Sequence, residues 1–539
     1  MIEIDGHCLT IEQLVSVARA GEPVARLSEK VSAAMRQSQQ WLQEVVLRDE
    51  RTIYGVNTGF GPLANRRIQA SEARRLSRNV VLNCAAGLGD PVPDEVVRAM
   101  MLIRANSLAK GLSGVRPSVA DTLVQMLNRG VIPEVPEKGS LGASGDLAPQ
   151  AHIAAVLLAE PEAENAGDRA SGSGGGSARE DDGFSGFARY AGERLTGAAA
   201  MERAGLARIR AEPKDGLALT NGMDFMLGCA ALGVADAESI LEHAVISAAL
   251  SLEALCALSA AFHPAIHEAA GQPGQRRVAA RLRSLLSESQ LIDAQAEKVQ
   301  DAYSLRCVPQ ALGPAWDVVA FLRERITAAI NAASDNPLVF MNLPGEEPRT
   351  ISGGNFHGQG PALWLDMLGI AVADPASMAE RRIFRLLTPE LSGGLPSMLV
   401  ENSGLDSGLM VAQYTAAALV SDNKTLAHPD SVDSIPSSAN QEDHVSMGAN
   451  AARHAREILA NVRSVIAIEL MTATQAIDLR PQGPERLGRG TRVAHRCVRE
   501  RVVGLERDRE LTPDILAVDD LVRSGTLLEA VNEAVGPAA

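Results

Sequence analysis

The sequence predicts a mainly α-helical fold with a smaller mixed N-terminal part, and three observations lead to this prediction. Aromatic residues make up only 3% of the 539 residues, whereas Ala and Leu, which favour helices, are plentiful. The stretch 223–330 has a helical texture over most of its length. Residues 451–478 repeat apolar side chains at the spacing of one helix face. We expect a chain of this length to form two or three domains.

Charge and cysteine content limit the classes of partner and site. The formal net charge of −15 argues against nucleic acid or an anionic membrane surface as a partner. Six cysteines are scattered without a CxxC pair, so we expect reduced thiols, no metal site and a cytoplasmic location. The amino terminus lacks the pattern of a signal peptide. The apolar run 244–262 contains Glu253 and is flanked by histidines, so we expect a buried core helix there.

The N-terminal part contains a glycine-rich loop at residues 54–65, with three glycines and a proline within eight positions. Its 59–64 stretch matches G-x-G-x-x-A, but no convincing strand precedes it, so an active-site lid beginning at Tyr54 is the better interpretation. Helical patterns follow at 95–111 and 119–130. Residues 160–186 form a Gly/Ser-rich, charged segment that we expect to be a disordered insertion.

The tripeptide Ala143-Ser144-Gly145 lies in the small-residue stretch 139–149. Attack of the Gly145 nitrogen on the Ala143 carbonyl carbon would close a five-membered ring, and loss of water, including the Ser144 hydroxyl, would leave an electron-poor methylene. Glycine favours such a close approach because no side chain shields its amide. Two other readings are a capped turn before a helix and a G-x-S-x-G nucleophile elbow. The elbow fails because Asp146 stands in place of the second glycine.

Further polar clusters follow among the helices. Tyr303 and Arg306 stand three residues apart, shortly before a proline. A second small-residue loop spans 352–360, and a polar run spans 439–444. The tail from about residue 480 is expected to form shorter helices with charged faces.

Together, these clusters resemble the histidine, phenylalanine and tyrosine ammonia-lyases and the related aminomutases over roughly residues 50–480. The resemblance rests on several long motifs in a common order, at residues 54–61, 142–149, 303–307, 334–338 and 438–447. It implies a long central helical bundle of the aspartase/ammonia-lyase type. It also implies a 4-methylideneimidazol-5-one group (MIO), formed autocatalytically from Ala143-Ser144-Gly145, and a homotetramer whose active sites are shared between subunits.

The resemblance also implies roles for individual residues. Tyr54 would take the β-proton, and Arg306 would bind the substrate carboxylate through its planar fork. Asn221 and Tyr303 would hydrogen-bond the MIO carbonyl and so increase its electrophilicity. The remaining residues implied to line the pocket are Phe356, Asn440 and Gln441.

The expected identity of the substrate depends on Glu442 and on the pair Asn83-Cys84. Glu442 is the residue type that the histidine enzymes have at this position of the motif. A carboxylate there could accept a hydrogen bond from the N–H of an imidazole ring. The pair Asn83-Cys84 matches neither the Ser-His of histidine enzymes nor the pairs of tyrosine and phenylalanine enzymes. Val308 and the 356–359 spelling also depart from the histidine branch. L-Histidine or a histidine-like amino acid is therefore the expected substrate.

We accordingly predict an ammonia-lyase that converts an aromatic L-amino acid to the corresponding acrylate, with L-histidine to urocanate as the leading reaction. The alternatives are an aminomutase that forms a β-amino acid, a tyrosine or phenylalanine ammonia-lyase, and a non-catalytic paralogue. The predicted parts are an N-terminal MIO-bearing domain with the lid at 1–200, a central bundle at 201–480 and a helical tail at 481–539.

Overall fold

The computed structural model describes residues 1–48, 51–159, 185–295 and 297–538. Helices dominate, and the few strands are short, so the mainly α-helical fold is confirmed. The chain divides into two compact units. Unit 1 comprises 1–232, 323–365 and 429–453, and unit 2 comprises 233–322, 366–428 and 454–539. Each unit therefore draws on segments far apart in sequence, and the three linear parts at 1–200, 201–480 and 481–539 stay a prediction.

Unit 1 holds most of the short elements of the chain. Its helices are α1 (Ile11–Val15), the π-helical turn η1 (Ser16–Ala20), α2 (Glu29–Leu47), α3 (Ala73–Cys84), α4 (Asp94–Ala109), α5 (Pro117–Arg129), α6 (Leu147–Leu157), α7 (Gly197–Arg203) and α8 (Asp215–Thr220), with 3-10 turns η2 (Gly61–Leu63), η3 (Ala70–Glu72) and η6 (Ser438–Asn440). Its strands are β1 (Leu88–Pro91), β2 (Ile132–Pro133), β3 (Pro136–Lys138), β4 (Leu158–Ala159), β5 (Phe187–Tyr190), β6 (Glu193–Thr196), β7 (Ile209–Arg210), β8 (Leu338–Phe340) and β9 (Arg349–Ile351).

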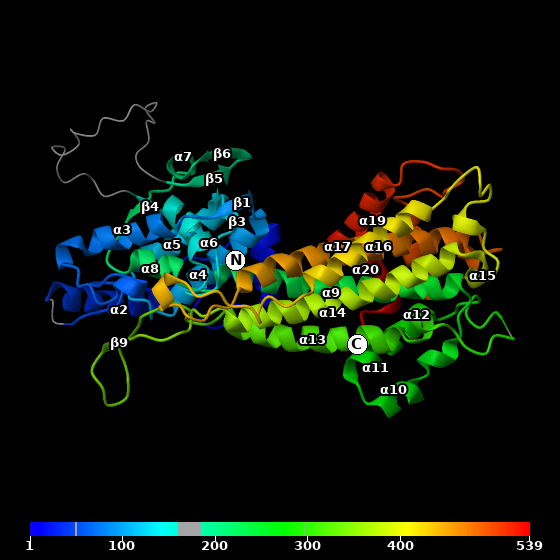
Figure 1. Ribbon diagram of the computed structural model, residues 1–539, viewed down its shortest axis with the longest axis horizontal. Coiled ribbons are helices and arrows are strands. Elements are labelled where there is room, and N and C mark those ends of the chain that lie inside the picture. The colour runs from blue at the N-terminus through cyan, green and yellow to red at the C-terminus, as the bar shows by residue number, and fades with distance from the viewer. Residues whose placement is uncertain (49–50, 160–184, 296, 539) are drawn as a thin grey trace. The chain divides into compact units, whose positions relative to one another are not determined.

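Small sheets and packed helices build unit 1. The pairs β1–β3 and β8–β9 and the ribbon β2–β5–β6 are antiparallel, whereas β4 and β7 pair in parallel. Helices α3, α4, α5, α6 and α8 pack beside one another (Figure 1). Local sequence explains helix ends: α5 begins with Pro117 and ends at Gly130, whose φ of 72° is left-handed. Helix α2 begins after Ser28, whose side chain accepts a hydrogen bond from the Val31 amide.

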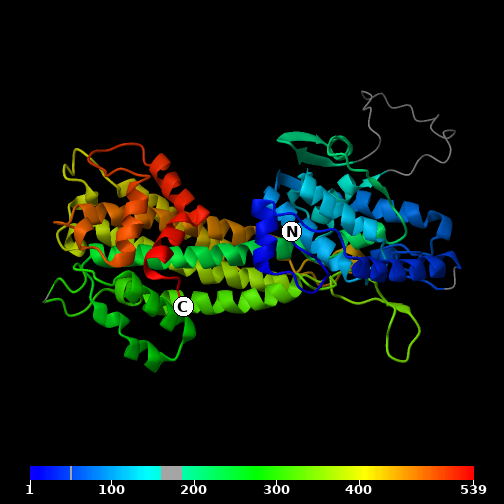
Figure 2. The same ribbon diagram turned by 180° about the vertical axis from the view of Figure 1, so that it is seen from behind.

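Four long helices have residues in both units: α9 (Asp224–Ala254), α13 (Val308–Ala329), α14 (Gln359–Leu387) and α17 (Gly448–Asp478). The other helices of unit 2 are η4 (Ser259–Phe262), α10 (Pro264–Ala270), α11 (Pro273–Leu285), α12 (Tyr303–Arg306), α15 (Pro389–Ser392), η5 (Ser397–Leu399), α16 (Met410–Leu426), η7 (Pro484–Arg486), α18 (Arg489–Arg499), α19 (Thr512–Ser524) and α20 (Thr526–Val535). In unit 2 the long helices run alongside one another, and the C-terminal helices, drawn in red, lie against this bundle (Figures 1 and 2).

The predicted core helix at 244–262 is buried over residues 244–257, as expected. Its helix is α9, which ends at Ala254, so the prediction ran several residues too far. The mid-run Glu253 is fully buried and accepts a hydrogen bond from the Gly488 amide at 2.7 Å. Burial raises the pKa of this carboxyl. One described helix, α14, is long and apolar enough to cross a membrane by length and composition alone.

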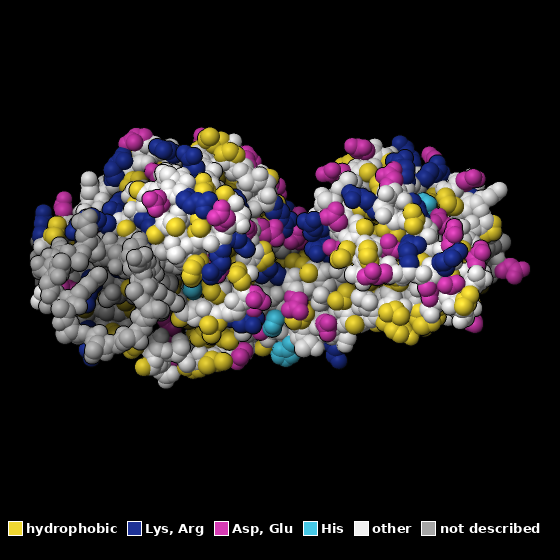
Figure 3. Space-filling view, turned by 90° about the horizontal axis from the view of Figure 1, so that it is seen from above, with side chains coloured by type: hydrophobic (Ala, Val, Ile, Leu, Met, Phe, Trp, Pro, Cys, Tyr) yellow, Lys and Arg dark blue, Asp and Glu magenta, His cyan; other side chains and the backbone are white. Residues whose placement is uncertain are grey.

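The predicted insertion at 160–186 lies outside the described residues apart from its last two positions. The helices predicted at 95–111, 119–130 and 451–478 correspond to α4, α5 and α17. On the face shown in Figure 3, Lys and Arg side chains are interspersed with Asp and Glu side chains. The acidic balance of the chain is therefore not gathered into one negative patch on that face.

Candidate active site

The Ala143-Ser144-Gly145 tripeptide lies between β3 and α6, and Gly145 pairs with Gly222, the second residue after the end of α8. Gly145 has a φ of +76°, and a Cβ added to it would lie 2.1 Å from the Gly222 carbonyl oxygen. The Asp146 amide donates to that same oxygen at 2.6 Å. Only glycine fits at position 145, because both the left-handed backbone and the facing carbonyl exclude a side chain.

Ser144 is held from two sides by residues distant in sequence. Its carbonyl oxygen accepts a hydrogen bond from Asn221 Nδ2 at 2.7 Å, and Asn221 is buried. Its hydroxyl donates to Glu442 Oε1 at 2.8 Å. The other oxygen of Glu442 accepts from the Ser437 hydroxyl at 2.8 Å. The structure thus brings together three residues that the sequence singled out separately.

The segment after Glu442 runs alongside the tripeptide and fixes its backbone. Gly142 accepts from the Ser446 hydroxyl and from the Gly358 amide, both at 3.0 Å. The Ala143 side chain packs in a small apolar cluster with Val445 and Met447. The tripeptide is therefore enclosed by backbone and small side chains from three stretches of the chain.

Asp146 directly follows the tripeptide and is fully buried. Burial raises the pKa of this carboxyl to about 7, and the nearby carboxylate of Asp224 acts in the same direction. Its oxygens accept hydrogen bonds from the Ser140 hydroxyl and the Met226 amide, both at 3.0 Å. Asp224 itself pairs with the buried Arg104 at 2.6 Å. A carboxyl with such a pKa can exchange a proton near neutral pH.

Tyr54 is half-buried and begins the glycine-rich loop, as predicted. Its hydroxyl oxygen accepts a hydrogen bond from the Gly61 amide at 3.1 Å, and its ring meets Phe60 edge-on at 6.3 Å. Turn η2 of this loop packs against η6, the turn that precedes Glu442. The loop of Tyr54 and the loop of Glu442 are therefore neighbours within unit 1.

The pair Asn83-Cys84 ends α3, with Asn83 exposed and Cys84 half-buried. Burial raises the pKa of the Cys84 thiol to about 11, and the negative charge of Glu442 adds to this shift. Cys84 is therefore a neutral thiol within the electrostatic reach of Glu442.

Phe356, Asn440 and Gln441 lie on the loops that flank the tripeptide. Phe356 is half-buried, and Asn440 and Gln441 are exposed. The residue after Phe356, His357, stacks on His444 with ring centroids 5.6 Å apart and donates from Nε2 to the His444 carbonyl at 3.1 Å. This contact ties the 352–360 loop to the 438–447 segment.

Tyr303 and Arg306 belong to unit 2. They form the four-residue helix α12, where the Arg306 guanidinium lies 4.7 Å above the Tyr303 ring centre. Tyr303 is 70% exposed. Within the described part of the chain, no carboxylate is paired with Arg306, and its Nε is buried without a hydrogen-bond partner. Arg306 is thus a cation that a carboxylate ligand could bind.

Sequence reasoning missed several residues of the site. Gly222 faces Gly145, Ser437 holds Glu442, and Ser446 and Gly358 hold Gly142. Gly222 directly follows Asn221, so the Asn-Gly pair was a signal that could have identified it. The serines carried no such signal, because serine is common in loops.

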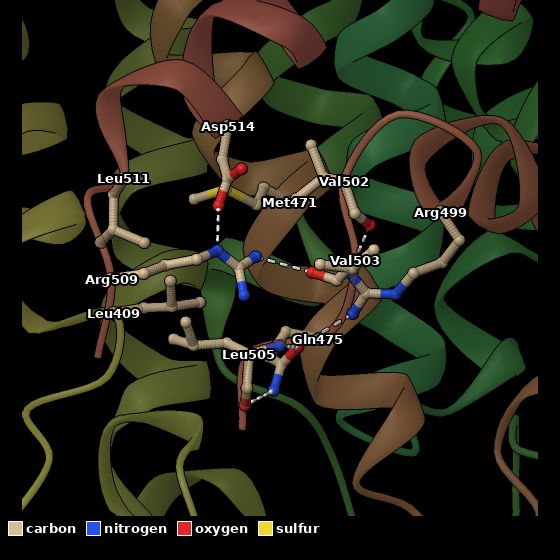
Figure 4. Close-up of a pocket in the computed structure, with 10 residues that line it drawn as sticks. All are labelled: Leu409, Met471, Gln475, Arg499, Val502, Val503, Leu505, Arg509, Leu511 and Asp514. Carbon is tan, nitrogen blue, oxygen red and sulfur yellow. Dashed lines mark hydrogen bonds and ion pairs between the residues drawn. The ribbon is translucent and has the colours of Figure 1, made fainter. Parts of the chain in front are cut away.

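A small pocket in unit 2 is distinct from these residues. Figure 4 shows that its polar groups point at one another: Arg509 pairs with Asp514 at 2.9 Å, and Arg499 donates to Gln475 at 2.9 Å. Its charges are therefore satisfied within the chain. Among the described residues, no group of three or more His, Cys, Asp or Glu side chains could hold a metal ion.

Known proteins resemble this chain over nearly its whole length. The model of the aromatic amino acid lyase family matches residues 9–500. A histidine ammonia-lyase of Alkaliphilus oremlandii is 46% identical over 535 residues, covering 99% of each chain. Among solved structures, a tyrosine aminomutase from Streptomyces globisporus has a TM-score of 0.89 at 33% identity, covering 99% of each chain. A histidine ammonia-lyase from Trypanosoma cruzi has a TM-score of 0.86 at 36% identity, covering 99% of this chain and 95% of its own.

Proposed function

The chain belongs to the aromatic amino acid lyase family and is a carbon–nitrogen lyase, and from this premise we propose that it eliminates ammonia from L-histidine or a histidine-like amino acid to give urocanate or its analogue. The observation that carries the proposal is the position of Glu442. Its carboxylate accepts a hydrogen bond from the Ser144 hydroxyl at 2.8 Å, and its charge contributes to the raised pKa of the Cys84 thiol. A carboxylate at that place can accept the N–H of an imidazole ring. Beside a benzene ring, which offers no hydrogen-bond donor, burying the same carboxylate would cost free energy.

The residues around Ser144 fit an MIO group formed from Ala143-Ser144-Gly145. Gly145 leaves its amide unshielded, and the Asn221 amide already donates to the Ser144 carbonyl at 2.7 Å. The backbone of Gly142 is held by two hydrogen bonds at 3.0 Å, which supports a fixed geometry for ring closure. When formed, the group supplies an electrophilic methylene to which the amine of the substrate can bind.

The chain's own side chains would orient the substrate and move its proton. Arg306 would bind the α-carboxylate through two parallel charge-assisted hydrogen bonds. Glu442 would accept the ring N–H, so that the two ends of the substrate are fixed. The Tyr54 hydroxyl oxygen, which accepts from the Gly61 amide, would take the β-proton. Phe356, Asn83, Cys84 and Gln441 would complete the walls of the pocket.

We further propose that the protein is a cytoplasmic homotetramer in which Tyr303 and Arg306 of one copy complete the site of another. The exposure of Tyr303 at 70% and the lack of a carboxylate paired with Arg306 in the described chain support this assignment. Helix α16 also exposes Val411 and Tyr414, at 59% and 58%, as expected for a surface that a second copy covers.

Two measurements on the purified wild-type protein test the proposal. Intact mass should be two water molecules below the mass encoded by the sequence, because MIO formation removes two waters. Incubation with a panel of aromatic L-amino acids should release ammonia and an acrylate, fastest with histidine or a histidine-like substrate. An unmodified mass in folded protein would refute the MIO assignment, and turnover of phenylalanine or tyrosine alone would refute the substrate.

An aminomutase is the second candidate, favoured by the similarity to the tyrosine aminomutase from Streptomyces globisporus. The same residues would serve both reactions, because the aminomutase only adds ammonia back at the β-carbon. Product analysis separates them. A β-amino acid as the main product identifies an aminomutase, whereas free ammonia with the acrylate identifies a lyase.

A further inference from the structure

A fully buried ion pair joins two of the long helices in unit 2. Arg382 on α14 and Glu469 on α17 are both 0% exposed. The Arg382 Nε and Nη2 atoms donate to the two oxygens of Glu469 at 2.5 and 2.9 Å. Ser247 and Ser251 on α9 each donate to one of those oxygens at 2.7 Å. Every oxygen of this carboxylate therefore has two donors.

The third nitrogen of Arg382 reaches the segment that carries the predicted carboxylate clamp. Arg382 Nη1 donates to the Ser304 carbonyl oxygen at 3.3 Å. Ser304 lies inside α12, between Tyr303 and Arg306. A single helical turn is not stable by itself, so α12 depends on contacts from elsewhere to keep its conformation. Arg382 supplies one such contact directly to its backbone.

The chain before α12 is also anchored. Asp301 accepts a hydrogen bond from the Leu258 amide at 2.7 Å and pairs with Lys298 at 2.6 Å. These contacts hold the entry to the helix, whereas the Ser304 carbonyl is held by Arg382. The orientation of α12 is thus set at two places, and the second of them is the buried ion pair.

Stability alone does not explain such a pair. Removing two charges from water is costly, and apolar replacements of buried pairs are often neutral or stabilising. The pair fixes the orientation of the Arg382 guanidinium, because a guanidinium is planar and presents its donors in a rigid fork. With two nitrogens fixed on Glu469, the third can point at only one place, which is the Ser304 carbonyl.

We propose that Arg382 is a positioning residue that, held by Glu469, aligns α12 so that Arg306 presents its guanidinium to the substrate carboxylate. The inference rests on the proposed function only for the role of Arg306. The alignment itself is a property of unit 2 and can be measured without substrate.

The test variant is Arg382→Lys in the full-length protein. Lysine keeps the charge opposite Glu469 but has one nitrogen, so it cannot also hold Ser304. We expect KM for the amino acid substrate to rise about tenfold with a smaller change in kcat, because a misplaced clamp weakens substrate binding. Backbone amides of residues 303–307 should also exchange hydrogen faster than in the wild type.

Arg281→Lys is the matched control. Arg281 is also buried in unit 2, pairs with Glu242 at 3.2 Å and donates to the Gly536 carbonyl at 2.6 Å. The same change of chemistry there should lower the Tm, as in Arg382→Lys, without raising KM or the exchange of residues 303–307. Affinity for urocanate, which carries a carboxylate, should fall in Arg382→Lys more than affinity for histamine, which does not.

The outcomes separate the two proposals. If Arg382→Lys leaves both KM and the exchange of 303–307 unchanged, or if Arg281→Lys changes them equally, Arg382 does not position α12. If the wild type lacks activity and keeps an unmodified mass, the proposed function fails, while the exchange measurement still decides the alignment. Should Arg382→Lys fail to fold, the double variant Arg382→Met with Glu469→Gln removes both charges and must show the same faster exchange.

Discussion

The surroundings of Ser144 in unit 1 and the surroundings of α12 in unit 2 are built by different means. In unit 1 the backbone around Gly145 packs against other main-chain groups, as in the 2.6 Å contact from the Asp146 amide to the Gly222 carbonyl, and the side chains of Asn221 and Glu442 hold Ser144 directly. In unit 2 the backbone of α12 is held by a charged side chain, Arg382, which is itself held by other side chains. Ring closure needs backbone atoms pressed together, whereas a substrate clamp needs a long side chain aimed correctly. Substitutions that add atoms should therefore disrupt the tripeptide region of unit 1, whereas substitutions that remove hydrogen-bond donors should disrupt the α12 region of unit 2.

Gly145→Ala should have the largest effect. The new Cβ would lie 2.1 Å from the Gly222 carbonyl oxygen at a φ of +76°, so the tripeptide cannot keep its conformation. We expect no loss of the two waters in the intact mass, no measurable activity and a lower Tm. Gly130→Ala is the control, because Gly130 has a similar φ of +72° with nothing within 4 Å. It should cost only about 1–2 kcal/mol of stability and leave the mass shift intact.

Ser144→Ala should abolish activity with only a small loss of stability. The substitution removes the hydroxyl that the proposed dehydration requires but adds no atoms. Glu442 keeps its hydrogen bond from Ser437, so the loss in the free energy of unfolding should stay near 1 kcal/mol. Activity assays, intact mass and thermal melting check this together. Turnover at the wild-type rate would show that the proposed chemistry is wrong.

Cys84→His should have a moderate effect, confined to specificity. The neutral thiol of Cys84 lies within the electrostatic influence of Glu442, and an imidazole there would add a ring nitrogen that can contact the substrate ring. We expect kcat/KM for L-histidine to rise about tenfold, the size of effect that one polar contact gives. Cys84→Ser, without a ring, should not show this gain. A fall in activity toward L-histidine with Cys84→His would mean that the side chain at position 84 does not contact the imidazole ring of the substrate.

The smallest effects concern pH, and they have opposite signs in the two units. Asp146 in unit 1 has its pKa raised by burial to about 7, from an ordinary 3.8. Between these values the folded state binds more protons than the unfolded state, so this carboxyl makes the protein less stable as pH rises from 4 to 7. Relative to Asp146→Asn, the Tm of the wild type should fall by a few degrees over that range.

His243 in unit 2 gives the reverse expectation. Burial in α9 lowers the pKa of this imidazole to about 4, from 6.5. The unfolded state then binds more protons between these values, so stability falls as pH drops from 6.5 to 4. Relative to His243→Gln, the wild type should lose Tm on acidification. Melting curves of both variants at pH 5 and pH 7 test the two signs, and equal slopes would contradict them.

Local patterns predicted the helices well but could not reveal long-range contacts. The periodicity at 451–478 identified α17, and the motifs at 54, 143, 221 and 442 identified residues that unit 1 brings together. Arg382 and Glu469 drew no prediction, because nothing in the sequence near either residue shows that residues 87 positions apart meet in the core. The same holds for Ser437 and Ser446, whose role depends on the loop that they face. Helix α9 ends at Ala254, before the end of the apolar run 244–262. The prediction missed this boundary because an apolar run does not show where a helix stops.

The groups that hold the tripeptide come from Asn221, Gly358 and Ser446, which only the folded chain brings to it. Under the proposed function, folding therefore comes before the chemistry, and a newly translated molecule is native-like but inactive. Specific activity then reports the age of a preparation as well as its purity. Cells lysed soon after a short burst of expression should yield protein whose activity rises on standing at constant concentration, and the mass spectrum should follow that rise.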